Sequence, residues 1–348
     1  MPQSATTTPA APPCASSFNP QDWAILARHW YPVARIQDVQ QTPVTARLLD
    51  VPLVLFRSSE GLCVARDVCP HRGVPLSMGR LDGDALVCAY HGLRFGSDGR
   101  CRKIPAQPEL KPAARLNLTH YPAIERYGLI WTCLAPDEAS EIPPMPSWDD
   151  PAHQTILPEP VDIAGSAGRQ VEGFVDVAHF AFVHAAAFAD PDNSVVPSYD
   201  TEFTDFGLRT HYASSVSNYP QGLQHLAPPD FVWLRVFEVY PPFSARLTVH
   251  FPAVGLLNIL NAACPVSATR TRLFVPITRN FDTGSPLEPV YAFNAQIFAE
   301  DQALIERQWP LQLPLDPHEE AHFAADRSSL GYRRLLREMG LSFKSAPT

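Results

Sequence analysis

The spacing of apolar residues predicts short strands in the first third of the chain. Residues 46–57 (ARLLDVPLVLFR) indicate a strand with a turn at 50–52. Residues 84–100 indicate two strands separated by a His-Gly loop and followed by a Ser-Asp-Gly turn, and a short helix is expected over 23–31. This pattern favours a small antiparallel β domain.

The pattern changes after a proline-rich stretch, 141–151 (EIPPMPSWDDP), which disfavours regular structure and marks the expected domain boundary. Residues 245–251 alternate strictly between apolar and polar, so one face of their sheet should be buried and the other wetter. The expected helices are 169–184 and 286–309, and the expected strands are 201–217, 231–240, 245–251 and 271–280.

These elements predict an α+β protein with two domains, which its 348 residues are enough to fill. We expect a disordered tail at 1–17, an all-β domain at 18–145, and a domain of antiparallel sheet and helices at 146–348.

Charge and composition exclude several classes of partner. Lys and Arg number 27 against 36 Asp and Glu, a net charge of -9 without a basic block, which argues against nucleic acid or an anionic membrane as partner. No apolar run is long enough to span a bilayer, and the Pro/Ala/Thr/Ser-rich start lacks the charged start and apolar core of a signal peptide. We therefore expect a cytoplasmic protein with no membrane partner.

Two short loops, 69–73 (CPHRG) and 88–92 (CAYHG), each offer one cysteine and one histidine. A Rieske [2Fe-2S] cluster uses two cysteines on one iron and two histidines on the other. Tetrahedral zinc is the alternative, but zinc modules usually pair Cys with Cys and His with His at close spacing. The predicted cluster ligands are Cys69, His71, Cys88 and His91.

The other five cysteines have no spacing typical of a disulfide framework, and we expect free thiols in a reducing compartment. They are Cys14, Cys63, Cys101, Cys133 and Cys264.

A second metal site is indicated by the segment 172–184 (EGFVDVAHFAFVH). Asp176 and His179 are three residues apart and share a helix face. His179 and His184 are five apart and would point about 140° apart on a regular helix, so they could not easily share one ion. We expect the helix to end or widen locally between Ala181 and Val183.

Two imidazoles need a third anchor, and the helix 286–309 offers Glu300 and Asp301. On a helical wheel Asp301 falls within an apolar stripe, whereas Glu300 lies at its edge and can reach water. A buried salt bridge from Asp301 to Arg169 or Arg235 is the alternative. The histidine pair favours metal, because two histidines and one carboxylate form the facial triad of non-heme Fe(II) oxygenases. The predicted iron ligands are His179, His184 and Asp301.

Together, the cluster loops and the spacing Asp176-x-x-His179-x-x-x-x-His184 resemble the Rieske non-heme iron oxygenases, over residues 30–337. The stretches CPHRGVPLSMG, ERYGLIW and HFAFVH are most similar to the branch that includes methylxanthine N-demethylases and saxitoxin-pathway hydroxylases. The resemblance implies an N-terminal Rieske domain, a C-terminal helix-grip catalytic domain and a head-to-tail homotrimer. It also implies that Asp176 links a cluster histidine of one subunit to an iron histidine of its neighbour.

Three positions depart from the family pattern. Ala89 replaces the usual proline, Leu93 the usual tryptophan after His-Gly, and Gly173 the asparagine that many members carry. None of these changes removes a ligand, so the expected activity stands.

That activity is hydroxylation of a small aromatic or heterocyclic substrate by O2, or demethylation when the attacked carbon is an N-methyl or O-methyl group. Inserting one oxygen atom consumes two external electrons, and the chain has no G-x-G-x-x-G turn for a nicotinamide or flavin. We therefore expect a separate NAD(P)H-dependent reductase. A cis-dihydroxylating dioxygenase and a non-catalytic electron carrier are the alternatives. Arg209, Arg235 and Arg246 are candidates to meet an anionic substrate, although surface strand positions explain them equally well.

Overall fold

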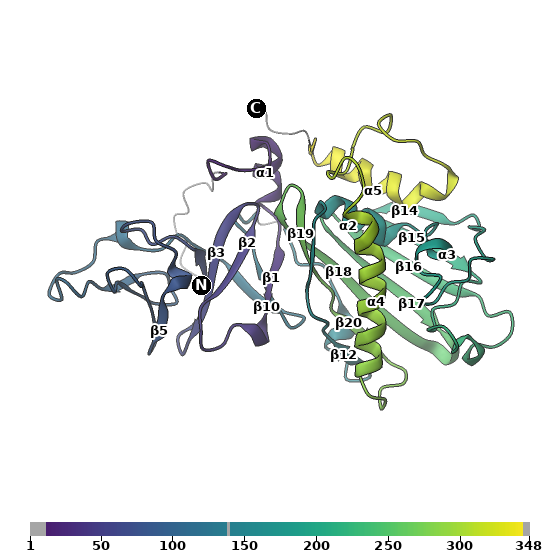
Figure 1. Cartoon of the computed structure of the whole chain (residues 1–348), viewed down its shortest axis with the longest axis horizontal. Helices are drawn as coiled ribbons and strands as arrows, with labels where there is room; N and C mark the ends of the chain where they lie inside the picture. Colours follow the sequence, from purple (N-terminus) through teal and green to yellow (C-terminus); the bar gives the residue numbers. More distant parts are fainter. Residues whose placement is uncertain (1–11, 138–139, 344–348) are drawn as a thin grey trace. The chain divides into compact units, whose positions relative to one another are not determined.

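The computed structural model describes residues 12–137 and 140–343, which divide into two compact units, Met1–Ile142 and Pro143–Thr348 (Figure 1). Residues 1–11 of the expected tail lie outside the described residues. Its end at Ser17 is tied to the first unit, because the backbone N–H and Oγ of Ser17 both donate to Asp50 Oδ2, at 2.8 and 2.7 Å. None of the described helices is long and apolar enough to cross a membrane.

The first unit consists of small antiparallel sheets, as the strand pattern predicts. One sheet has the order β1-β11-β10, a second β2-β3-β4-β9 and a third β5-β6-β7-β8. The strands are β1 (Tyr31–Arg35), β2 (Val44–Leu48), β3 (Val51–Ser58), β4 (Gly61–Arg66), β5 (Arg80–Asp82), β6 (Ala85–Val87), β7 (Arg94–Phe95), β8 (Cys101–Lys103), β9 (His120–Tyr121), β10 (Ala123–Arg126) and β11 (Leu129–Thr132).

The helix expected over 23–31 begins and ends earlier, as α1 (Pro20–Leu26). The Asn19 side chain accepts from the N–H of Asp22, and proline occupies the first helical position, which together start the helix three residues sooner. Tyr31 instead begins β1, whose five residues are all buried. The turn between β2 and β3 falls at Leu49 and Asp50, both with positive φ, one residue before the expected position.

The second unit is built on one nine-stranded antiparallel sheet, and the α+β prediction is confirmed. The order is β12-β20-β18-β17-β16-β15-β14, with β19 pairing both β13 and β18. The strands are β12 (Gln154–Ile156), β13 (Val161–Ile163), β14 (Asp200–Thr204), β15 (Gly207–Ser214), β16 (Trp233–Tyr240), β17 (Ser244–Phe251), β18 (Gly255–Ser267), β19 (Arg270–Phe274) and β20 (Ile277–Arg279).

Four helices accompany this sheet: α2 (Ala167–Val175), α3 (Phe180–Val183), α4 (Glu288–Ile305) and α5 (Arg327–Glu338). Helix α2 packs on β17, β18 and β19, α5 on β14 and β15, and α4 on α2 and β13 (Figure 1). Helices α2 and α4 meet closely, because a Cβ on Gly173 would lie 3.6 Å from Ile305 Cδ1. This packing brings α3 and α4, which are far apart in sequence, to the same place.

The helix expected over 169–184 is broken earlier than predicted. The prediction placed the break between Ala181 and Val183, but α2 ends at Val175 and α3 begins only at Phe180. Asp176 has extended backbone, φ -73° and ψ 133°, and its Oδ1 accepts the N–H of Ala178 at 2.6 Å. A short acidic side chain that bonds the backbone two residues on competes with helix continuation and ends α2 here.

Buried ion pairs fix α2 against α5. Arg333 donates to Glu172, with Nη2 to Oε2 at 2.9 Å, and both Arg333 and Arg169 donate to Glu320. Arg333 and Arg169 are 4% and 3% exposed, so removing one partner would leave charge buried without compensation. The network holds the helix that leads into the histidine segment.

Candidate metal centres

The two cysteine-histidine loops of the first unit have the same backbone design. In the loop between β4 and β5, the N–H of Cys69 donates to Val74 O and the N–H of Gly73 to Cys69 O, both at 2.9 Å. In the loop between β6 and β7, Cys88 donates to Leu93 O at 2.9 Å and Gly92 to Cys88 O at 3.0 Å. Both glycines are left-handed, with φ +75° and +68°, which side chains disfavour. The loops therefore present their cysteine and histidine equivalently.

The two sulfur ligands lie together and the two nitrogen ligands lie together, as a Rieske cluster requires. The thiols of Cys69 and Cys88 are close enough to interact, and the Nδ1 atoms of His71 and His91 are 3.2 Å apart. Both cysteines are 2% exposed, and burial raises the pKa of the Cys69 thiol to about 11. Two sulfur ligands beside two nitrogen ligands fit a pair of irons better than a single tetrahedral ion, because the sulfur atoms can hold one iron and the nitrogen atoms the other.

Two family departures are accommodated locally. Leu93 is 3% exposed and belongs to the apolar core beneath the loops, so a smaller apolar side chain fills the position of the usual tryptophan. Ala89 is exposed. Between Cys88 and His91, the ring of Tyr90 lies against His91 with centroids 3.8 Å apart, and Tyr90 is 64% exposed.

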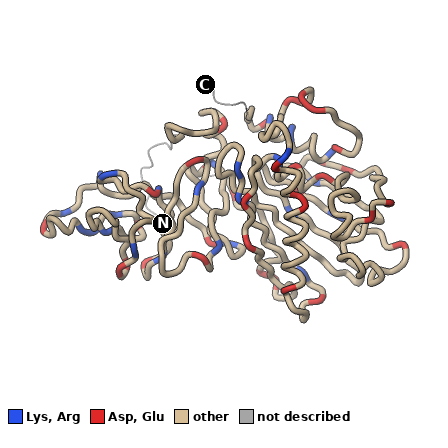
Figure 2. Tube along the Cα trace, in the orientation of Figure 1, with Lys and Arg blue, Asp and Glu red and all other residues tan. Residues whose placement is uncertain are grey.

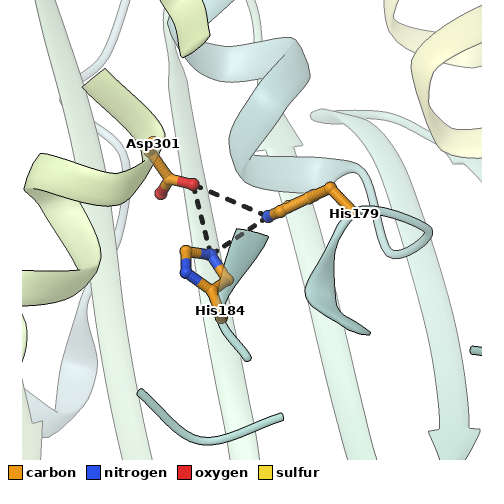
Figure 3. Close-up of side chains that lie close together, drawn as sticks. All are labelled: His179, His184 and Asp301. Carbon is orange, nitrogen blue, oxygen red and sulfur yellow. Dashed lines mark hydrogen bonds and ion pairs between the residues drawn. The ribbon is translucent and has the colours of Figure 1, made fainter. Parts of the chain in front are cut away.

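The second unit brings His179, His184 and Asp301 together, with one ligand atom from each inside a 4.8 Å group (Figure 3). The Nε2 atoms of the histidines are 3.2 Å apart, and Asp301 Oδ1 lies 3.2 Å from Nε2 of His184 and 3.6 Å from Nε2 of His179. The histidines flank the single turn of α3, and the aspartate comes from the last turns of α4. Because α3 is so short, five residues of separation do not force the rings apart.

The donor set fits a divalent cation. Two imidazole nitrogens and one carboxylate oxygen, all within 3.6 Å of one another, form a donor set that one divalent cation at their centre can use. Two nitrogens and one oxygen on one side leave further coordination positions open, as in non-heme Fe(II) sites. The residues present therefore suit mononuclear iron.

Carboxylates also contact the outer nitrogens of both histidines, but unequally. Glu300 Oε2 is 2.8 Å from His184 Nδ1, whereas Asp176 Oδ1 is 3.7 Å from His179 Nδ1. The ring of His184 stacks on Phe188 with centroids 5.1 Å apart. Opposing effects act on the pKa of His184: burial lowers it, and the hydrogen bonds that the ring donates to Asp301 and Glu300 outweigh burial and raise it.

One expectation about this site is wrong. Glu300, expected to reach water, has a side chain only 19% exposed, less than the 25% of Asp301, and it contacts His184. The alternative salt bridge to Asp301 is absent from the described residues. Arg169 binds Glu172 and Glu320, and Arg235 donates to the carbonyls of residues 216 and 217.

The apolar stripe on α4 is also weaker than the helical wheel suggested, because Leu304 is 51% exposed. Sequence reasoning considered Glu300 only as a possible ligand and missed its contact with His184. The sequence did offer a signal for this contact. Glu300 directly precedes the candidate ligand Asp301, and Gln296 lies one turn earlier on the same helix face, where it can hold the Glu300 side chain.

Comparison with known proteins identifies the class. The Rieske [2Fe-2S] domain family matches residues 29–122, and the vanillate O-demethylase oxygenase C-terminal domain family matches residues 164–342. The chain belongs to the Rieske non-heme iron oxygenases, which are oxidoreductases that carry a [2Fe-2S] cluster and a mononuclear iron.

Two of the similar relatives are methylxanthine demethylases. The chain is 31% identical to methylxanthine N1-demethylase NdmA of Pseudomonas putida over 90% of this chain and 89% of that protein. It is 28% identical to methylxanthine N3-demethylase NdmB of the same organism over 92% of each. The solved structure of NdmA with caffeine matches with a TM-score of 0.80 at 29% identity, covering 91% of this chain and 92% of that one. Dicamba monooxygenase, at 22% identity and a TM-score of 0.78, shares the fold.

Proposed function

We propose that this chain is the terminal oxygenase of a Rieske monooxygenase system that hydroxylates or oxidatively demethylates a small aromatic or heterocyclic compound. The observation that carries the proposal is the presence of two different ligand sets in one chain. One unit holds paired cysteines and paired histidines, and the other holds two histidines and an aspartate. The relatives NdmA and dicamba O-demethylase, which act on methylated ring compounds by name, support the substrate class.

Each residue then has a stated role. Cys69 and Cys88 would hold one iron of the cluster and His71 and His91 the other. His179, His184 and Asp301 would hold Fe(II), leaving positions open for O2. When bound, this iron supplies oxygen activation next to the substrate. We infer that Asp176 couples the centres in a head-to-tail homotrimer, since it lies beside His179 and its side chain remains 35% exposed.

Electrons would come from a separate NAD(P)H-dependent reductase that docks near the cluster. Residues 66–115, which contain the cluster loops, hold nine Lys and Arg against five Asp and Glu, although the whole chain is acidic. Basic side chains gather over β5 to β8, whereas acidic ones are frequent in the second unit (Figure 2). Six cations here are exposed and lie more than 4.0 Å from any carboxylate of the described residues: Arg66, Arg72, Arg80, Lys103, Lys111 and Arg115. The basic surface of residues 66–115 favours an electron donor with an acidic docking surface.

A cytoplasmic location suits this role. All seven cysteines are free of disulfides, and six of them are buried, as in proteins of a reducing compartment.

The alternative of a non-catalytic electron carrier leaves the His179, His184 and Asp301 set without a purpose. Of the arginines considered for an anionic substrate, Arg209 and Arg246 both pair with Glu238, and Arg209 also pairs with Glu202, so both guanidinium groups already have carboxylate partners.

Turnover assays test the proposal. The protein with O2, NADH and a generic ferredoxin reductase system would be screened against methylated heterocycles, methoxybenzoates and aryl sulfonates. We expect formaldehyde or a hydroxylated product from at least one class, lost in Asp301→Ala. Formation of a cis-diol would identify a dioxygenase instead, and product formation that persists in Asp301→Ala would exclude the assigned iron site.

A further inference from the structure

One iron-site histidine is contacted on both ring nitrogens by consecutive residues of α4. Glu300 Oε2 lies 2.8 Å from His184 Nδ1, and Asp301 Oδ1 lies 3.2 Å from Nε2. The His184 side chain is 3% exposed and its ring stacks on Phe188 with 29° between the planes. The ring plane and both nitrogens are therefore fixed by the protein itself.

This arrangement selects which nitrogen carries the proton. A neutral imidazole has one N–H, and a carboxylate beside Nδ1 accepts it, which leaves the Nε2 lone pair free for a metal. His179 has no equally close partner, because Asp176 Oδ1 is 3.7 Å from its Nδ1 and already accepts the N–H of Ala178. The two histidines are thus held to different degrees.

Glu300 is itself held in place. Its second oxygen, Oε1, accepts from Gln296 Nε2 at 2.9 Å, one turn earlier on α4. No Lys or Arg of the described residues lies within 4.0 Å of Glu300, so no competing cation draws its carboxylate away from the imidazole. Both carboxylate oxygens are engaged, and the contact from Gln296 aims the other oxygen at His184.

We propose that Glu300 is a positioning residue that selects the metal-binding tautomer of His184 and fixes its ring, and thereby sets the iron affinity of the site. This inference rests on the proposed function, which places Fe(II) at His179, His184 and Asp301. Glu300 does not bind the metal, because its near oxygen contacts the outer nitrogen of the ring.

The test measures metal affinity instead of turnover. Co(II) is titrated anaerobically into full-length protein that retains its cluster and lacks mononuclear iron, for wild type, Glu300→Ala, Glu300→Gln and Gln296→Ala. We expect Glu300→Ala to bind Co(II) about 10- to 100-fold more weakly. Glu300→Gln keeps an acceptor oxygen and should lose less, and Gln296→Ala should lose least. Glu288→Ala, at an exposed glutamate at the start of α4, is the control and should match wild type.

A spectroscopic signature separates positioning from general destabilisation. In the Co(II) protein the His184 Nδ1–H should give a paramagnetically shifted proton resonance that exchanges slowly with solvent, because Glu300 covers it. We expect this slow exchange to be lost in Glu300→Ala and kept in Glu288→Ala. The cluster absorbance, unchanged in every variant, reports that the first unit is intact.

The outcomes distinguish this inference from the proposed function. If wild type binds no Co(II) and no Fe(II) beyond its cluster, the proposed function fails. If wild type binds and Asp301→Ala does not, but Glu300→Ala binds within threefold of wild type, only the inference fails. If Glu300→Ala loses Co(II) binding as completely as Asp301→Ala does, Glu300 is itself a ligand, and the inference is also overturned.

Discussion

The two metal centres are built by opposite strategies. All four cluster ligands lie within residues 69–91, on two loops with matching backbone hydrogen bonds at the ends of short strands. The iron ligands instead come from the two ends of α3 and from α4, which precede and follow the strands β14 to β20 in sequence. Their meeting depends on how α2, α4 and α5 pack on and around the sheet. The cluster geometry is therefore local, and the iron geometry depends on the tertiary structure.

This difference predicts that each centre can be removed without the other. Asp301→Ala should have the largest effect, because it deletes one of three ligands and the only charged one. We expect iron to fall from about three to about two per chain. Elemental analysis and the cluster's absorbance measure both centres in one sample, and iron content equal to wild type would refute the assignment.

The reciprocal change is Cys88→Ala. We expect loss of the cluster absorbance while Co(II) binding in the second unit stays within about threefold of wild type, because that site uses no residue of the loops. If Cys88→Ala also abolished Co(II) binding, the two centres would not be structurally independent.

Arg333→Met tests whether tertiary packing supports the iron site. It leaves the buried Glu172 and the partly buried Glu320 with Arg169 as their one remaining cation among the described residues, and we expect a loss of about 3–5 kcal/mol in unfolding free energy. Iron affinity should fall with it, while the cluster spectrum in native buffer is unchanged. Arg334→Met is the matched control, since that neighbouring side chain is 57% exposed and its pair with Glu338 contributes about 0–1 kcal/mol. Equal destabilisation by both variants, in denaturant unfolding, would contradict this role.

The local design of the cluster loops is tested by a pair of glycines. Gly92→Ala places a Cβ at φ +68° and 3.2 Å from Pro105, so we expect about 1–2 kcal/mol of strain and reduced cluster occupancy. Gly173→Ala, in helical backbone with an ordinary 3.6 Å contact to Ile305, should keep full occupancy of both centres and gain up to about 1 kcal/mol of helix propensity. Labile sulfide per chain measures the first effect, and normal sulfide in Gly92→Ala would show that loop strain is unimportant.

The smallest effect concerns acid stability of the second unit. Burial acts to raise the pKa of Glu238, but hydrogen bonds from Arg209 and Arg246 outweigh it and lower the pKa. A lowered carboxyl pKa contributes stability above about pH 4.5 that is lost as pH falls through the folded value. We therefore expect Glu238→Gln to be less stable than wild type at pH 7 and the difference to shrink below about pH 4.5. A difference that grows in acid would contradict this sign.

The same contrast explains what could be predicted from the sequence. The cluster ligands follow from two local motifs, so spacing alone names them. At the iron site, ligand chemistry selects His179, His184 and Asp301, but the predicted position of the helix break and the predicted exposure of Glu300 were wrong. The break in the helix depends on the side chain of Asp176 bonding the backbone, and the burial of Glu300 depends on α4 meeting α3. Neither can be derived from the periodicity of one segment.

The missed elements have a similar cause. Strand β18 is buried through most of its 13 residues and contacts strands on both sides, so its sequence lacks the alternation that indicated β17. Helix α5 is rich in arginine, and its buried face includes Ser328, Arg333 and Tyr332, whose partners come from elsewhere in the unit. Apolar spacing does not identify a helix whose inner face is partly polar.

The most direct test of the account is a single turnover followed through the reduced cluster. The protein is reduced with dithionite, freed of excess reductant, and mixed with O2 and a substrate found in the screen, and the EPR signal of the reduced cluster is measured over time. The account predicts rapid loss of the signal in wild type, with about one product per two electrons, and a signal that persists at least tenfold longer in Asp301→Ala. Equal decay in both proteins would show that electrons leave the cluster without passing to iron at His179, His184 and Asp301.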